Sequence, residues 1–372
     1  MTHSQHLENW LGKAKVEELS ASMVNWYGPP IALQGVPGNV FAHAGGDFHG
    51  RILAGSEVSA IERAETLLKK SSKARTIAYA MMHKQSGMAG FTSLSDMISE
   101  STVNNKRREY AFIKNGSTGV VAITNSLWGL GAQPAAGANA SNAPGGDAPT
   151  DATPGAFPID NVSPDTRHFV SGWISSSVIS NTALLYDRIF QVNKTMNSTA
   201  TEAVTGVPTR YQSAVVTDAD YAGGNFLFVE VGGTALAATA HNWTVCTYTD
   251  QDGNVGATLP SLTGNSGALV RTLDHPVGRW FAPLATGDSG VKALTQMQCS
   301  ALVATGVINF VIGHPIAFMP CQAANLICLV DGINTSFNLV RVFDDAALAF
   351  LEITKPSTTA TNYTGSFLCV HG

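Results

Sequence analysis

The sequence predicts an α+β protein in which an N-terminal arm with two helices precedes a mainly antiparallel β-sandwich of jelly-roll type. Helix-period apolar residues occur in the first third of the 372 residues, and a run rich in Ala, Gly, Pro and Asn follows them. The remainder alternates between apolar, strand-like segments and Gly-, Asp- and Asn-rich turns. We therefore divide the chain into an extended arm (1–55), a helical docking segment (56–115), a linker or loop (116–157) and a β-sandwich domain (158–372).

The helical segment is predicted from two stretches. Residues 55–84 place Val58, Ile61 and Leu68 near a 3.6-residue period behind a possible N-cap at Ser56. A second helical stretch is expected over 93–113. The prolines and glycines that precede both stretches favour an extended arm over a packed domain.

The β-domain is predicted from strand-like runs that are rich in β-branched and aromatic residues. Turn material separates them, and the tight turn around Asp252 and Gly253 gives the clearest hairpin signal. Some eight to ten strands without an intervening long helix indicate a single antiparallel sandwich. The runs are 168–178, 183–192, 225–232, 242–250, 306–319, 325–332, 346–354 and 365–372.

The chain carries unusually little charge, and that charge is unevenly placed. Charged residues make up 13% of the sequence, against about 25% in typical soluble domains. Residues 1–115 carry a net charge of +3 and the remainder −8. So weakly charged a surface favours association, and a basic segment joined to an acidic one suggests two different neighbours.

Several classes of protein are not expected. The hydrophobic fraction of 44% argues against a disordered chain. The longest apolar run, 306–321, is interrupted by Asn309, His314 and Pro315, so no membrane span is expected. The polar N-terminus gives no sign of a secretory signal.

The cysteines and a histidine-rich loop are candidate chemical sites. Cys246, Cys299, Cys321, Cys328 and Cys369 show no Cys-x-x-Cys spacing and lie among apolar residues, which predicts buried free thiols, with intermolecular disulfides as the alternative. The loop from His43 through Asp47 to His49 superficially resembles a metal site but lacks a further ligand nearby. We expect no metal and no cofactor.

Catalytic motifs are missing from the sequence. It contains no Gly-x-Ser-x-Gly elbow, no phosphate-binding loop and no His-Glu-x-x-His motif, and the segment 250–254 is better explained as a turn than as a calcium loop. The sequence therefore predicts a protein that is not an enzyme.

Two groups of charged residues are candidate interface or structural sites. Asp187, Arg188, Arg341, Asp344 and Asp345 interrupt apolar strands. We expect ion pairs at sheet edges or between subunits. Paired carboxylates for acid–base work are the alternative.

The second group is the basic triplet Lys106, Arg107 and Arg108, which is flanked by aromatic residues. It could dock on an acidic partner, or it could be a solvated helical face. With a pI near 6.0, the chain is not expected to bind nucleic acid sequence-specifically.

An ordered series of short motifs resembles a family of virion structural proteins in tailed bacteriophages. The match extends over about residues 147–372, and its specificity comes from the order of the motifs. The hairpin departs from the family pattern at Gln251 and Asp252. The motifs are DAPTDATPGAFPI, LLYDRIF, TGVPTRY, TYTDQDGNVGATLPSL, FAPLATGDSGVKAL, LVRVFDDAALAFLEI and GSFLCVHG.

The resemblance implies a non-enzymatic β-sandwich that is present in many copies in a virion. Our leading hypothesis is a capsid decoration or cement protein. It would be assembled in the host cytoplasm as a homo-oligomer, with a trimer favoured, and residues 1–115 would attach it to other capsid proteins. A major capsid protein and a tail or fibre component are alternatives within the same class.

A glycan-binding or glycan-cleaving sandwich is the alternative from another class. Trp173, Trp243 and Trp280 would then be stacking platforms, and Asp187 with Asp344 would be the carboxyl pair.

Overall fold

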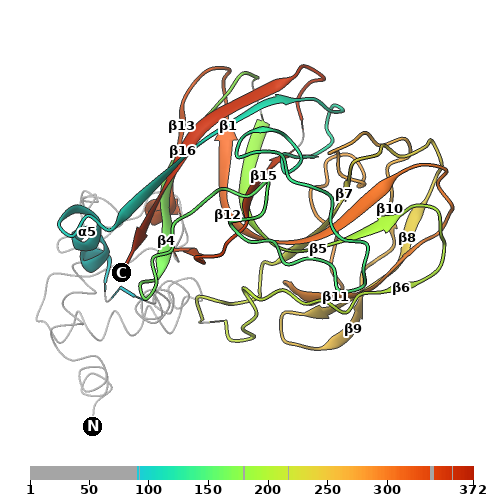
Figure 1. Ribbon diagram of the computed structural model, residues 1–372, viewed down its shortest axis with the longest axis horizontal. Coiled ribbons are helices and arrows are strands. Elements are labelled where there is room, and N and C mark those ends of the chain that lie inside the picture. Colours follow the sequence, from blue (N-terminus) through green and yellow to red (C-terminus); the bar gives the residue numbers. More distant parts are fainter. Residues whose placement is uncertain (1–89, 92, 179–180, 217, 336–338, 354) are drawn as a thin grey trace, which may run out of the picture. The chain divides into compact units, whose positions relative to one another are not determined.

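The described part of the chain is mostly β-structure, arranged in three sheets whose strand pairs are antiparallel (Figure 1). It belongs to the compact unit Gln85–Gly372. The mainly antiparallel β architecture that the sequence predicts is confirmed, whereas the arm (1–55) and the first helix (55–84) lie outside the described residues. The computed structural model describes residues 90–91, 93–178, 181–216, 218–335, 339–353 and 355–372.

The first sheet, here called the terminal sheet, joins the first and last described strands. Its last strand lies between two long partners and pairs with both in antiparallel register. Its order is β13 (Cys328–Asp331), β4 (Arg167–Ser176), β16 (Thr361–His371), β1 (Arg107–Ser117) and β3 (Ala132–Gln133), and β14 (Arg341–Val342) also pairs with β4.

The central sheet contains the two longest strands, and the third sheet, the distal sheet, completes the fold. The central order is β2 (Asn125–Ser126), β15 (Leu348–Ile353), β5 (Asn181–Thr195), β12 (Val307–Cys321) and β7 (Phe226–Val231). The distal order is β10 (Leu262–Thr263), β8 (Asn242–Asp250), β11 (Val291–Cys299) and β6 (Glu202–Ala203), with β9 (Val255–Thr258) paired to β8.

The central sheet supplies side chains to two large hydrophobic cores. One core joins it to the terminal sheet, where the rings of Phe112 and Phe350 lie 4.6 Å apart. The other joins it to the distal sheet, where Trp243 meets Phe310 edge-on at 4.7 Å. Because β5 and β12 are each 15 residues long, they contribute to both cores. Figure 1 shows these two strands running from the terminal sheet towards the distal sheet.

The second predicted helix is wrong beyond its first nine residues. Helix α5 (Leu94–Thr102) begins at Ser93, whose hydroxyl accepts a hydrogen bond from the Asp96 backbone N–H at 3.1 Å. The chain then leaves the helix, with Asn105 in the left-handed region at φ 56°. Residues 107–113 form β1 instead, because their alternating burial suits a strand with one face on the core.

The predicted linker, 116–157, is packed into this unit and does not separate two domains. It carries buried Trp128 and Phe157. The indole Nε1 of Trp128 donates to the Ala138 carbonyl at 3.0 Å. A Cβ at Gly137 would lie 2.3 Å from that nitrogen, so the small residues of this stretch leave room for a large ring. The boundary expected before residue 158 is therefore not where the structure divides the chain.

The hairpin prediction agrees with the structure, whereas some shorter or more polar elements were not predicted. The hairpin is confirmed: β8 and β9 pair in antiparallel register, and the turn glycine, Gly253, has φ +93°. The sequence did not single out β1 or β11, both of which carry polar residues at many positions. The second short helix, α6 (Gly332–Thr335), is a single turn that was not predicted either.

Candidate functional site

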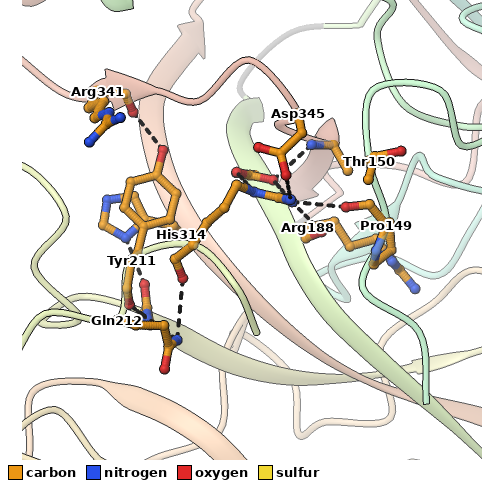
Figure 2. A network of polar contacts seen from close by, with 12 residues as sticks. Pro149, Thr150, Arg188, Tyr211, Gln212, His314, Arg341 and Asp345 are labelled. Carbon is orange, nitrogen blue, oxygen red and sulfur yellow. Dashed lines mark hydrogen bonds and ion pairs between the residues drawn. The ribbon is translucent and has the colours of Figure 1, made fainter. Parts of the chain in front are cut away.

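Two of the charged residues expected from the sequence, Asp187 and Asp345, meet at one arginine in a largely buried network beside β5 (Figure 2). Asp187 receives two hydrogen bonds from Arg210, Nε to Oδ2 and Nη2 to Oδ1, both at 2.8 Å. The Ala347 backbone N–H adds a third at 2.9 Å, and Arg210 Nη2 also donates to the Pro149 carbonyl at 2.9 Å. Burial raises the pKa of Asp187, while Arg210 opposes that shift. The pair ties β5 to the segments around Arg210 and Pro149.

Asp345 forms the outer edge of this network. Its Oδ2 lies 3.2 Å from Arg210 Nη1, and its side chain is half exposed. Figure 2 shows Asp345 and Pro149 converging on the same region as Arg188. The expected ion pairs of Asp187 and Asp345 are thus present within one chain. Both carboxylates pair with Arg210, which the sequence analysis did not identify as a candidate.

Arg188 engages a different set of partners. Its Nη2 lies 2.6 Å from Glu230 Oε1, and its Nε donates to Gln191 Oε1 at 2.6 Å. The guanidinium also lies over the Trp128 ring at 4.7 Å, and Asn309 Nδ2 donates to Glu230 at 3.0 Å. The expected ion pair exists and is buried, and it links β5 in the interior of the central sheet to β7 at its edge.

Arg341 is not part of the ion-pair network. Its guanidinium lies 4.0 Å from the centre of the Phe343 ring, and its backbone carbonyl accepts a hydrogen bond from the Tyr211 hydroxyl at 2.5 Å. Tyr211 in turn stacks on His314, with ring centroids 3.7 Å apart and planes 5° from parallel (Figure 2). His314 Nδ1 pairs with Asn225 Oδ1 at 2.7 Å, and burial lowers the pKa of His314 to about 3. This imidazole is a neutral packing group.

Asp344 is held apart from Asp187. Its carboxylate accepts the backbone N–H groups of Val162 and Ser163 at 3.2 and 3.1 Å, and it lies 3.4 Å from Arg167 Nη2. The two carboxylates thus bind different arginines, and Asp187 is fully buried. They do not converge on a cleft, which acid–base work on a glycosidic bond would require.

The basic triplet lies at the end of α5 and the start of β1, not on a helical face. Lys106 Nζ is 3.0 Å from Glu100 and 3.1 Å from Asp165, and Arg108 Nε is 2.6 Å from Asp160. Arg107 is exposed beside a depression on the terminal sheet. Two of the three cations are therefore already neutralised within the chain.

The three tryptophans lie against different sheets. Trp243 is buried, and its Nε1 donates to Asp274 at 2.8 Å. Trp280 packs among aromatic rings, with Phe281 4.6 Å and Phe318 5.6 Å away. Trp173 lines the depression on the terminal sheet. They do not form a shared stacking surface.

The remaining expectations concern the cysteines, metal sites and membrane spans. All five cysteines are free, and four of them are buried while Cys328 is partly exposed, so the predicted free thiols are confirmed within one chain. Over the described ranges, no cluster of His, Cys, Asp and Glu could hold a metal ion, and His43, Asp47 and His49 lie outside them. No helix in this part of the chain has the length and apolarity to span a membrane.

Sequence reasoning missed several buried polar residues. Glu230 and Glu352 each interrupt an apolar strand, a signal that could have identified them. Arg210 lies in a loop, where its sequence context carries no such signal. Glu352 lies 3.2 Å from Lys355 in a further fully buried ion pair, and Asp274 binds His241 at 3.0 Å in another buried cluster.

Comparisons with known proteins provide no family. Neither a protein-family model nor a curated protein matches the sequence. A search of solved structures gives "Structure of infectious bursal disease virus Gt strain", at 10% sequence identity and a TM-score of 0.13, covering 71% of this chain and 80% of that chain. A TM-score of 0.13 establishes neither a shared fold nor a shared function.

Proposed function

We propose that this protein is a structural component of a tailed-phage virion that binds and reinforces the capsid shell as a decoration or cement protein. It acts as a homo-oligomer, with three copies favoured, and contacts other capsid proteins. We further assign its strands to a β-sandwich of jelly-roll type. Support comes from the ordered motifs between residues 147 and 372, and from where the chain places its few charges.

The burial of charge is the observation that carries the proposal. Of the 33 Asp, Glu, Lys and Arg residues in 85–372, eleven are buried. Such residues are rarely fully buried unless they are paired. The other 22 are shared out over the whole solvent-facing surface of this unit, which is therefore as poor in charge as the 13% of the whole sequence suggests. The eleven are Lys114, Arg167, Asp187, Arg188, Lys194, Arg210, Glu230, Asp250, Asp274, Glu352 and Lys355.

Exposed apolar side chains provide further support. Leu326 and Ile327 are 55 and 58% exposed just before β13, an edge strand of the terminal sheet. Phe281 and Phe318 are 41 and 47% exposed and both contact the Trp280 ring. Aromatic residues are enriched, and charged residues depleted, in the centres of protein interfaces. A surface of this kind suits contacts with further copies or with a capsid lattice.

The buried ion pairs also suit a rigid building block. Such pairs contribute little net stability but penalise alternative packing, because each misplaced charge would remain buried and unpaired. The Asp187–Arg210 and Arg188–Glu230 pairs lie on neighbouring residues of β5 and reach different segments. The register of β5, one of the two longest strands, is thereby specified, which helps every subunit to present the same surface.

The oligomeric state of the purified full-length chain tests this proposal. Analytical ultracentrifugation over a hundredfold concentration range is expected to show one oligomer, of three copies. A stable monomer throughout that range would overturn it. Ile327→Asp and Phe318→Asp introduce charge into the two apolar regions, and Val255→Asp serves as a matched control on exposed strand β9. At least one of the first two variants should dissociate the oligomer, while the control should not.

A further inference from the structure

A depression on the outer face of the terminal sheet has the features of a ligand site. Its volume is about 600 Å³, within the range of small-molecule sites. Strands β13, β4, β16 and β1 build it, and they lie side by side in the sheet. We infer that this depression, hereafter the sheet-face depression, binds a short neutral oligosaccharide, a property beyond the proposed structural role.

Strand register aligns the lining side chains on one face. Leu329, Trp173 and Ser366 are directly opposite one another on β13, β4 and β16. On the neighbouring row, Asp331 and Glu109 lie at opposite ends of a line that crosses four strands. Residues two apart along a strand share a face, so both rows point into the same depression. The site is therefore built on rigid strands.

The apolar part of the lining suits a sugar ring. Trp173 is partly exposed and lines the depression, and the neighbouring Leu329 is 79% exposed. An indole offers a large flat face with few rotatable bonds, so ordering it on a ligand costs little entropy. A pyranose presents a face of C–H groups that can cover such a surface, while its hydroxyls stay at the rim.

The polar part of the lining offers donors and acceptors side by side. The Ser366 hydroxyl donates to Glu109 Oε1 at 2.7 Å, which orients that carboxylate. Arg107 lies two residues earlier on β1 and is exposed on the same face. A sugar hydroxyl both donates and accepts hydrogen bonds, so it can bridge a guanidinium and a carboxylate. The planar Arg107 guanidinium and Glu109 carboxylate are thus well matched to neighbouring hydroxyls of a sugar.

The charges select against ionic ligands. A polyanion would face the carboxylates of Glu109 and Asp331, and a polycation would face Arg107. Like-charge contacts of this kind disfavour binding. A neutral polyhydroxylated ligand meets neither penalty. The other two candidate tryptophans do not combine an accessible ring with neighbouring charges in this way. Trp243 is buried, and Trp280 packs among aromatic rings.

Titration calorimetry of the full-length chain with four neutral hexasaccharides, cellohexaose, maltohexaose, xylohexaose and chitohexaose, tests the inference. At least one should bind, and both Trp173→Ala and Arg107→Gln should weaken that binding about tenfold or more. Arg279→Gln, a change to an exposed arginine outside the depression, should leave the affinity within about twofold. Thermal unfolding establishes that each variant is folded, and Glu109→Gln replaces Trp173→Ala if the latter is not.

Three results would overturn the inference. The first is that none of the four sugars binds at millimolar concentration. The second is that binding survives both Trp173→Ala and Arg107→Gln. The third is that a heparin hexasaccharide or an oligolysine peptide binds at the depression, with Arg107 or Glu109 dependence, while the neutral sugars do not.

Discussion

Removing Arg210 should destabilise the protein more than any surface arginine does. In Arg210→Ala, Asp187 loses two hydrogen bonds of 2.8 Å and keeps only the Ala347 N–H, while its side chain stays fully buried. Breaking a buried pair in this way costs about 3–5 kcal/mol, because an uncompensated charge remains. The Pro149 carbonyl also loses its donor. The free energy of unfolding should therefore fall by at least about 3 kcal/mol.

Urea unfolding, followed by tryptophan fluorescence and by circular dichroism, measures this loss. The double variant Asp187→Leu/Arg210→Met removes both charges and should recover most of the stability, since an apolar pair of similar volume is often neutral. Arg279→Ala is the matched control, with an expected change within about 0.5 kcal/mol. A loss below about 1 kcal/mol for Arg210→Ala, or no recovery in the double variant, would refute the assignment of a buried, mutually dependent pair.

Three further changes probe pH dependence and backbone conformation. Burial lowers the pKa of His314 to about 3 and of His275 to about 4. The stability that these two neutral histidines contribute should thus be fully present above about pH 6.5. On acidification the free energy of unfolding should fall by up to about 1.4 kcal/mol per pH unit for each histidine. His314→Phe should remove the part of that slope that comes from His314. Burial also lowers the pKa of His241, but its hydrogen bond to Asp274, the attraction to that carboxylate's charge and the hydrogen bond to the Thr239 carbonyl together outweigh burial and raise the pKa. This contribution is present below about pH 6.5 and lost as pH rises through the folded pKa, so His241→Gln should cost most in acid. Gly253→Ala, at φ +93°, should cost about 1–2 kcal/mol.

Each of these predictions has a decisive contrary outcome. An acid slope that is unchanged in His314→Phe would show that this imidazole is not buried and neutral. A stability difference for His241→Gln that grows with pH would reverse the sign worked out for the Asp274 pair. A neutral Gly253→Ala would contradict the left-handed turn, and Gly131→Ala, where a Cβ has open space around it and φ is not positive, serves as its control.

The fold class was predictable because most strands bury alternate or continuous runs of apolar residues. The segments around β5, β12 and β15 are rich in Val, Ile, Leu and Phe and were identified from the sequence alone. Strand β1 was not, since RREYAFIK also fits a helical period with its cations on one side. Only its pairing with β16 selects the extended form. Such non-local contacts override local propensity.

The prediction that 116–157 is a linker was wrong for a related reason. Its small residues suggested a linker, yet Gly137 and Gly155 are small because the Trp128 ring packs against them. A composition signal cannot distinguish glycine that provides flexibility from glycine that provides close packing. The contact partner must be known.

The candidate charges were only partly predictable. A charge within an apolar strand marks a buried pair, and that signal correctly identified Asp187 and Arg188. Their partners, Arg210 and Glu230, are 23 and 42 residues further along the chain, which local patterns cannot connect. Arg341 was expected to form an ion pair and instead covers the Phe343 ring.

Copy number in purified phage particles tests the central claim most directly. Quantitative mass spectrometry of particles, with labelled peptides from this chain and from the shell-forming protein, gives the ratio of the two. A capsid decoration protein should be present in a fixed ratio, as a smaller multiple of the shell lattice. Equality with the lattice would identify the major capsid protein instead, and absence from purified particles would contradict a structural role in the virion.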